Sequence, residues 1–88
     1  LDPDVRELLP MFLEGRREDL AALRAADGLD VALRIGHQLK GTGATFGLPA
    51  LGDLGHKLEV AAKADDASAV ADPVAQLADL LDRIDAAL

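Results

Sequence analysis

The apolar residues of this chain recur at intervals of three and four positions, the spacing of one face of an α-helix. The clearest stripe is the C-terminal one, at Val70, Val74, Leu77, Leu81, Ile84 and Leu88. A third stretch has the same spacing at Leu51, Leu54, Leu58, Ala61 and Ala62. The first stretch carries Val5, Leu8, Leu9, Phe12, Leu20 and Leu23. With a second stretch over roughly residues 30–46, the pattern predicts four helices.

Short polar segments separate the first three stretches. Asp27 and Gly28 end the first stretch, and Asp30 is placed to cap the second helix. Gly47 can adopt the left-handed conformation after the second helix, and Pro49 suits the first turn of the third. The connections are therefore short and well marked.

The remaining breaks involve aspartate and proline. Asp65 and Asp66 supply a turn and an N-cap for the last helix. Pro10 must either start the long first helix or kink it, and we favour a short leading turn before it. Pro73 allows a local bend or a fresh start of the last helix. Because connections of two to four residues imply antiparallel neighbours, we predict an all-α, antiparallel up-and-down four-helix bundle, with a short extra N-terminal helix left open.

Composition agrees with this fold. The chain has 17 Ala and 17 Leu against nine Val, Ile and Thr together, which favours helices over strands. At 88 residues, two separate cores would each be too small, so residues 1–88 are expected to form a single domain. We also expect this domain to act as a monomer. Without Cys, neither a disulfide nor a thiolate metal site can form, and a cytoplasmic location is expected.

The net charge of the chain limits the classes of partner that it can bind. The formal net charge is -7, the basic residues are scattered, and the only aromatic side chains are two Phe. A polyanion would be repelled and would find no stacking platform, so nucleic acid and anionic membrane are excluded as partners. No apolar run is long enough to cross a bilayer. We expect the partner to be a protein.

The second stretch places His37 away from the core. At about 100° per residue, the direction opposite His37 is occupied by Val31, Ile35, Leu39, Thr42 and Phe46. His37 is therefore expected to face solvent. Four glycines fall within twelve residues, at Gly36, Gly41, Gly43 and Gly47. Because each costs a helix roughly 1 kcal/mol relative to Ala, we interpret this low bulk as clearance around the imidazole.

Such a histidine suits phosphoryl transfer, which needs in-line approach to an unhindered nitrogen. Gly41, one turn beyond His37, keeps that approach open. Lys40 can supply a fixed positive charge for the phosphoryl oxygens.

The surroundings of His37 are suited to docking a partner. An apolar collar of Leu33, Ala44 and Leu48 would fit a partner's helix, and Arg34 and Gln38 are expected to complete the docking face.

Other site types receive less support. His56 falls on the polar side of the third stretch, among Gly52, Glu59 and Lys63, and is interpreted as a solvated surface residue. Two histidines on different helices without a ligand-spaced carboxylate do not make a metal site, so none is predicted. The glycines at 41 and 43 lie inside a helix and are not followed by Gly-Lys-Ser/Thr, which argues against an ATP-binding loop.

The segment from His37 to Gly47, His-Gln-Leu-Lys-Gly-Thr-Gly-Ala-Thr-Phe-Gly, resembles the signature of histidine phosphotransfer (HPt) domains. The similarity extends to Leu51 and to Leu58-Glu59, and the four-stretch layout resembles that family's bundle over nearly the whole chain. The resemblance implies that His37 accepts a phosphoryl group from a receiver-domain aspartate and passes it to another receiver. It also implies that Lys40 assists and that Gly41 gives clearance.

On this resemblance the chain is a covalent phosphocarrier rather than an enzyme. It would bind no cofactor of its own, and its receiver partner would contribute Mg²⁺. The partners would be receiver domains of response regulators or of a hybrid sensor kinase. A histidine kinase dimerisation helix, with an acidic residue after the His and a Pro soon after, does not fit Gln38 and Thr42. Two alternatives stay open: a non-phosphorylated helical adaptor that binds a receiver, and the phosphodonor domain of a chemotaxis-type kinase.

Overall fold

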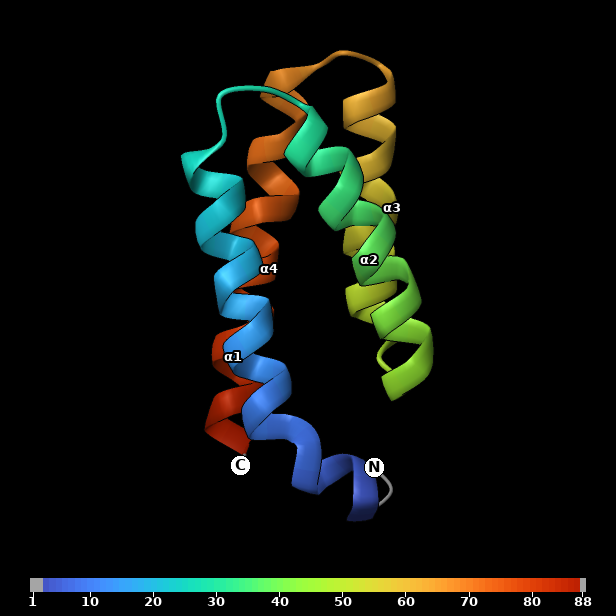
Figure 1. Ribbon diagram of the computed structural model, residues 1–88, viewed down its shortest axis with the longest axis vertical. Helices are drawn as coiled ribbons and strands as arrows, with labels where there is room; N and C mark the ends of the chain where they lie inside the picture. Colours follow the sequence, from blue (N-terminus) through green and yellow to red (C-terminus); the bar gives the residue numbers. More distant parts are fainter. Residues whose placement is uncertain (1–2, 88) are drawn as a thin grey trace.

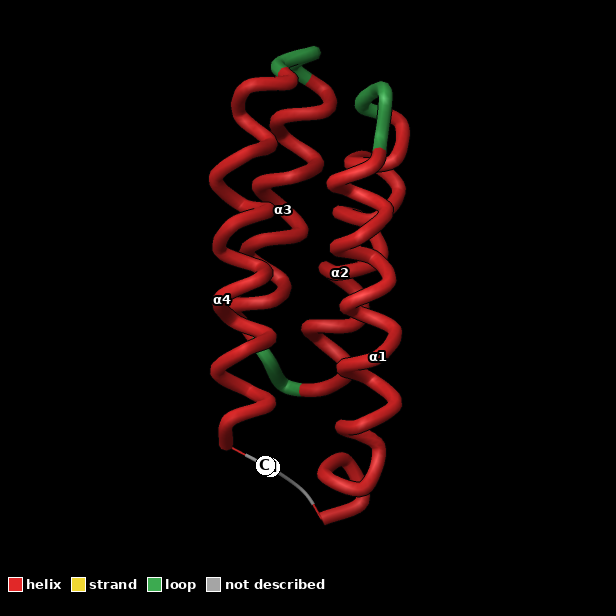
Figure 2. The backbone as a smooth tube through the Cα atoms, turned by 90° about the vertical axis from the view of Figure 1, so that its left-hand side faces the viewer, coloured by secondary structure: helices red, strands yellow, loops and turns green. Residues whose placement is uncertain are grey.

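The computed structural model describes residues 3–87, which form four antiparallel α-helices (Figure 1). The helices are α1 (Pro3–Ala25), α2 (Asp30–Phe46), α3 (Pro49–Lys63) and α4 (Ala71–Ala87), and a 3-10 turn, η1 (Ala67–Val70), precedes α4. Two connections lie at one end of the bundle and the α2–α3 turn lies at the other (Figure 2). The predicted up-and-down all-α bundle is confirmed, and none of the described helices is long and apolar enough to cross a membrane.

The bundle consists of two helix pairs. α2 and α3 make by far the most extensive contact of any two elements, whereas α1 packs chiefly against α4 (Figure 1). The molecule is elongated, with extents of 40 × 20 × 16 Å. A side chain on α2 is therefore positioned above all by α3.

Aliphatic side chains from all four helices fill the core. Its largest fully buried members are Ile35, Leu39, Leu51, Leu58, Leu77 and Leu81. The central positions of the predicted stripes on α2, α3 and α4 are thus confirmed. The stripe positions nearer the helix ends are only half-buried, at Val31, Thr42, Phe46, Val70, Val74 and Ile84.

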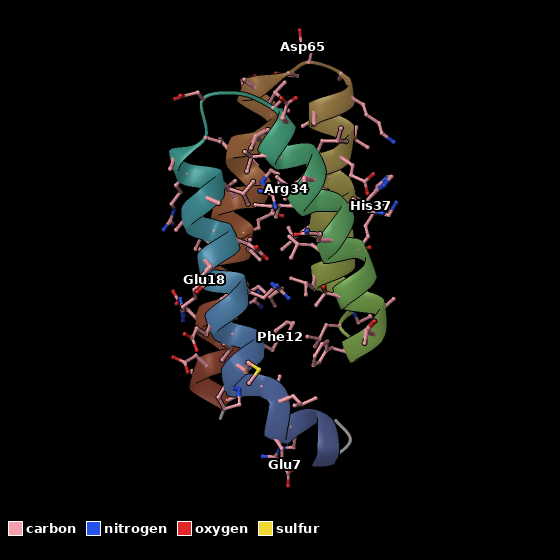
Figure 3. The ribbon with its side chains drawn as sticks, in the orientation of Figure 1. Glu7, Phe12, Glu18, Arg34, His37 and Asp65 are labelled. Atoms are coloured by element: carbon pink, nitrogen blue, oxygen red, sulfur yellow. The ribbon has the colours of Figure 1, made fainter. Side chains whose placement is uncertain are left out.

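The first helix departs from the prediction in three ways. Leu13, which the pattern did not single out, is buried at 5% exposure, whereas Leu8 is 51% exposed. The N-terminal end of α1 extends beyond the other helices (Figure 1), and Glu7, the residue before Leu8, lies at that end (Figure 3). α1 also continues through Pro10 with a bend, so no separate leading helix exists. The side chain of Val5, and Leu88, lie outside the described residues.

The α2–α3 turn has the left-handed glycine that the sequence predicts. Gly47 is left-handed, with φ 64° and ψ 38°. The N–H groups of Gly47 and Leu48 donate to the carbonyls of Ala44 and Gly43, which satisfies the end of α2. Pro49 is the first residue of α3. These two residues therefore fix where α2 ends and α3 begins.

Aspartate behaves differently at the two helix starts. Asp30 was expected to cap α2, but the N-cap is Leu29 and no side chain caps it. Asp30 instead lies in the first turn, where its charge still favours the helix N-terminus. Asp66 does cap, because its carboxylate accepts the N–H of Ala69 at 3.3 Å in η1. α4 begins afresh just before Pro73, so no bend is needed there.

Candidate functional site

His37 stands on the open face of α2. Its side chain is 81% exposed, and Figure 3 shows it projecting outward from the helix. Ile35 and Leu39, on either side of it in sequence, are fully buried. The imidazole is therefore held by a helix that is anchored in the core but leaves the ring free, as the pattern predicts.

A buried carboxylate from α3 lies beneath this histidine. Glu59 is 6% exposed, and it is the one buried charged residue of the described chain. Its Oε1 atom lies 3.9 Å from Nδ1 of His37 and 3.2 Å from Nζ of Lys40. Its Oε2 atom lies 3.8 Å from Nζ of Lys63, one turn along α3. The site is thus one imidazole, one carboxylate and two ammonium groups.

Opposing effects set the ionisation of Glu59. Burial by itself raises the pKa of the carboxyl group, and the ammonium groups of Lys40 and Lys63, with His37, lower it. The net pKa lies below its ordinary value. Glu59 therefore carries a full negative charge at neutral pH, held in place by the two lysines.

Glycine contacts bring Glu59 to this position. A Cβ on Gly55 would lie 2.5 Å from the carbonyl oxygen of Gly36 and 2.8 Å from the backbone nitrogen of Lys40. A Cβ on Gly43 would lie 2.6 Å from the backbone nitrogen of Gly52. The backbones of α2 and α3 are therefore in direct contact on both sides of Lys40.

These contacts correct the interpretation of the glycines as clearance for His37. Gly36 and Gly43 are buried, and they permit helix packing rather than access to the imidazole. Gly47 is required by the left-handed end of α2. Only Gly41 is open on the His37 face, because a Cβ there would meet nothing within 4 Å. The clearance interpretation thus applies to Gly41 alone.

The predicted docking residues divide into two groups. Leu33, Arg34, Gln38 and Ala44 are exposed on α2, with Leu33 at 39% exposure. Leu48 is instead half-buried and packs against the core. The expected collar is therefore open at the α2–α3 turn, because part of the Leu48 side chain belongs to the bundle interior.

Glu59 is the functional candidate that the sequence pattern misplaced. It was assigned to the solvated side of the third helix with His56, which is indeed exposed. A signal existed, since Gly52, Gly55 and Glu59 follow one another at three- and four-residue steps along α3. A carboxylate that continues a glycine stripe lies on the face nearest the neighbouring helix.

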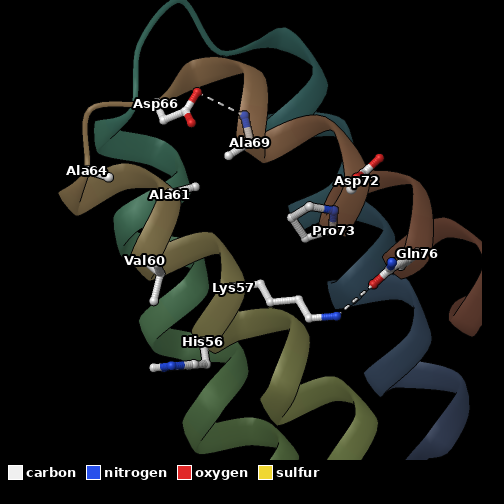
Figure 4. Close-up of a pocket in the computed structure, with 10 residues that line it drawn as sticks. All are labelled: His56, Lys57, Val60, Ala61, Ala64, Asp66, Ala69, Asp72, Pro73 and Gln76. Atoms are coloured by element: carbon white, nitrogen blue, oxygen red, sulfur yellow. Dashed lines mark hydrogen bonds between the residues drawn. The ribbon is translucent and has the colours of Figure 1, made fainter.

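A separate depression lies between α3 and the start of α4 (Figure 4). His56, Val60 and Pro73 line it, and Nζ of Lys57 donates to Oε1 of Gln76 at 3.3 Å across it. None of His37, Lys40 or Glu59 contributes to its lining. It is therefore distinct from the His37 site.

A four-helix bundle that raises one histidine on an open helix face has the architecture of a histidine phosphocarrier. The family model described as the Hpt domain matches residues 7–87, and the chain belongs to this family. Neither the curated proteins nor the solved structures give a match. Hpt domains take part in phosphotransfer within two-component phosphorelays, as phosphocarriers rather than enzymes, and interact with receiver domains. The family resemblance of the 37–47 segment is thereby confirmed.

The electrostatics of the site predict a change on removal of Lys40. We expect Lys40→Ala to raise the pKa of Glu59, because burial then opposes ionisation with less compensation. A ¹³C NMR titration of the Glu59 carboxyl group measures this. Lys57→Ala, on the same helix as Glu59 but turned toward Gln76, is the control and should leave the pKa unchanged. Equal titration curves in the wild type and Lys40→Ala would contradict the ion pair.

The same pKa sets a pH dependence of stability. Because the pKa of Glu59 is lowered in the folded protein, its ionised form stabilises the fold above the ordinary carboxyl pKa. That stabilisation is lost as the pH falls through the lowered value. Lys40→Ala should shift this loss toward higher pH.

Proposed function

We propose that His37 is the phosphoacceptor of this Hpt domain, taking a phosphoryl group from a receiver-domain aspartate and passing it to another receiver. The observation that carries the proposal is the exposure of His37, 81% of whose side chain is accessible on a helix anchored by fully buried neighbours. His56, the only other histidine, is also exposed but has no charged partner within an ion-pair distance among the described residues.

The geometry favours one ring nitrogen as the nucleophile. Nδ1 of His37 is the nitrogen near Glu59, so a proton on Nδ1 is stabilised by the carboxylate and the lone pair remains on Nε2. Nε2 attacks the phosphorus of the aspartyl phosphate in line, an N–P bond forms, and the P–O bond to the aspartate breaks. The aspartate leaves as a carboxylate. Attack on the phosphohistidine by an aspartate of a second receiver reverses these steps.

Lys40 and the partner supply the positive charge for this step. The Lys40 side chain is 45% exposed, so its ammonium group can reach phosphoryl oxygens on His37 as well as Glu59. In this proposal the domain binds no cofactor itself, and the receiver contributes Mg²⁺, which neutralises the transferring group.

The charge distribution supports docking on the α2–α3 face. Residues 30–63 contain four Lys or Arg and three Asp or Glu, a formal net charge of +1 in a chain of net charge -7. A receiver site with a phosphorylated aspartate and Mg²⁺-binding carboxylates is attracted to this face and repelled by the rest of the bundle. We assign its contacts to Leu33, Arg34, Gln38 and Ala44, with the exposed part of Leu48 at the edge.

Transfer assays with receiver domains test the proposal. The domain is incubated with a panel of radiolabelled phosphoreceivers and Mg²⁺, and the labelled residue is mapped by mass spectrometry. We expect acid-labile, base-stable label on His37. A receiver that binds the domain but never labels it would support the adaptor alternative and reject the phosphocarrier role.

Steric clearance at Gly41 gives a second test of the site. We expect Gly41→Glu to block transfer from a receiver, because a long anionic side chain one turn from His37 obstructs the in-line approach. Gly15→Glu is the matched control, since a Cβ on Gly15 in α1 also meets nothing within 4 Å. Both rates are measured by single-turnover transfer. Wild-type transfer in Gly41→Glu would remove Gly41 from the site.

A further inference from the structure

The third helix packs closely on only one of its two neighbours. Gly52 and Gly55 bring the backbone of α3 into direct contact with α2, whereas the contact of α3 with α4 is far less extensive. Small side chains that let two helices approach are thus used on the α2 side of α3. On the α4 side the two helices leave a space at the surface (Figure 4).

Two depressions between α3 and α4 join into one groove. The depression at the start of α4 has a volume of about 550 Å³, and a second one of about 240 Å³ lies nearer the start of α3. Lys57 and Gln76 line both of them, and the hydrogen bond between these two side chains crosses from one helix to the other. This α3–α4 groove follows α3 from Ala50 to Ala64, roughly 20 Å at 1.5 Å per helical residue. Its length is that of a helix of about four turns.

The α3–α4 groove has an apolar floor. Leu54, Ala61 and Pro73 are buried in it, and Leu80 is half-buried. Val60 is 52% exposed, more than any other large apolar side chain of α3. A helix with apolar side chains at three- and four-residue spacing would cover Val60 when it lies along this floor.

The charge along the groove is negative. Two basic and four acidic side chains line it, a formal net charge of -2, namely Lys57, Arg83, Asp53, Asp66, Asp72 and Asp79. Arg83 is already paired with Asp79 at 3.1 Å, and Lys57 donates to Gln76. Asp53 and Asp72 have no basic group within 4.0 Å among the described residues. The charge that is free to pair with a partner is therefore that of carboxylates.

We propose that the α3–α4 groove docks a basic amphipathic helix of a protein partner, about 14 residues long, as a second site beside the phosphoacceptor. The apolar side chains of this helix cover Val60, and its Lys or Arg side chains pair with Asp53 and Asp72. No residue of the His37 site lines the groove, so the bound helix leaves the imidazole accessible to a receiver. The inference goes beyond the proposed function and does not require phosphorylation of His37.

A peptide titration followed by NMR tests this proposal. The probe is a helical peptide of about 14 residues with Leu at three- and four-residue spacing and Lys elsewhere, and the control peptide has Glu in place of each Lys. We expect the Lys peptide to bind the ¹⁵N-labelled domain saturably, with the largest amide shifts at Val60, Gln76 and Leu80. Absence of saturable binding, equal binding of the Glu peptide, or largest shifts around His37 would overturn the proposal.

Matched variants separate the groove from the rest of the acidic surface. We expect Val60→Lys to weaken binding of the Lys peptide about tenfold, because it removes an apolar contact and adds a repelling cation. Met11→Lys makes a similar change at a 75% exposed position on α1 and should leave the affinity unchanged.

A second pair of variants tests the carboxylates. Asp72→Asn should weaken binding of the Lys peptide about threefold, through loss of one exposed ion pair. Asp30→Asn also removes a carboxylate from the first turn of a helix, and it should have no effect. Circular dichroism checks that each variant is folded. Equal affinities within either pair of folded variants would contradict the proposal.

A second copy of the domain is the alternative occupant of the groove. Sedimentation equilibrium distinguishes it from a partner helix. We expect the wild type and Val60→Lys to sediment alike, as monomers, at the concentrations used in the titration. A wild-type dimer that Val60→Lys dissociates would assign the groove to self-association and overturn the proposal.

Discussion

His37→Gln is expected to abolish phosphoryl transfer to this domain while leaving its helical circular dichroism unchanged. The Gln side chain has no nitrogen able to form the N–P bond, and α2 carries no other histidine to take its place. The fold should be unaffected because 81% of the His37 side chain is exposed and it fills no part of the core. Radiolabel from a phosphoreceiver should fall to the assay background.

His56→Gln is the natural control for this result. It removes the other histidine of the chain, which is exposed on α3 and has no carboxylate beneath it among the described residues. The His56→Gln variant should accept label from the receiver to the same extent as the wild type. Label retained in His37→Gln and lost in His56→Gln would place the phosphoacceptor on α3 and refute the proposed site.

Gly55→Ala is expected to destabilise the bundle by about 2 kcal/mol, because overpacking costs about 3 kcal/mol and better helix propensity returns about 1. The new methyl group would lie 2.5 Å from the carbonyl oxygen of Gly36 and 2.8 Å from the nitrogen of Lys40. Backbone atoms cannot rotate away as a flexible side chain can, so the two helices must separate. Urea denaturation measures the loss.

Gly41→Ala, on the neighbouring helix of the same pair, is expected to stabilise the bundle instead. A Cβ on Gly41 meets nothing within 4 Å, so the helix should gain roughly 0.5 to 1 kcal/mol of stability from the substitution. Similar free energies of unfolding for Gly55→Ala and Gly41→Ala would show that the close α2–α3 contact does not exist in solution. Gly55→Ala should also move Glu59 away from Lys40, so the pKa of Glu59 should rise with the loss of stability.

Much of the architecture follows from local sequence chemistry. The three- and four-residue apolar spacing places Leu77 and Leu81 in the core, because helical periodicity decides which side of a helix is apolar. Gly47 and Pro49 mark the α2–α3 turn because their backbone preferences suit few other positions. His37 is exposed because the same periodicity puts it opposite Ile35 and Leu39.

Features that depend on contact with a second element were harder to predict from the sequence. Asp30 has the chemistry of a cap, but the helix begins one residue earlier than capping requires. Leu8 is apolar and lies on a helical face, yet it is exposed, because α1 extends past its neighbours at the end where Glu7 lies (Figure 3). Whether a residue caps or is buried depends on where the adjoining chain lies.

By itself, the sequence determined four helices, their order, and an exposed histidine within the Hpt signature, because periodicity, turn residues and a contiguous motif are local properties. Only the tertiary structure decided that Gly36 and Gly43 pack against the third helix, so that the clearance interpretation holds for Gly41 alone. It also decided that Glu59 lies buried beneath His37 between two lysines. That carboxylate lies 22 positions further along the chain, and the close backbone contacts of Gly36 with Gly55 and of Gly43 with Gly52 bring it to the histidine.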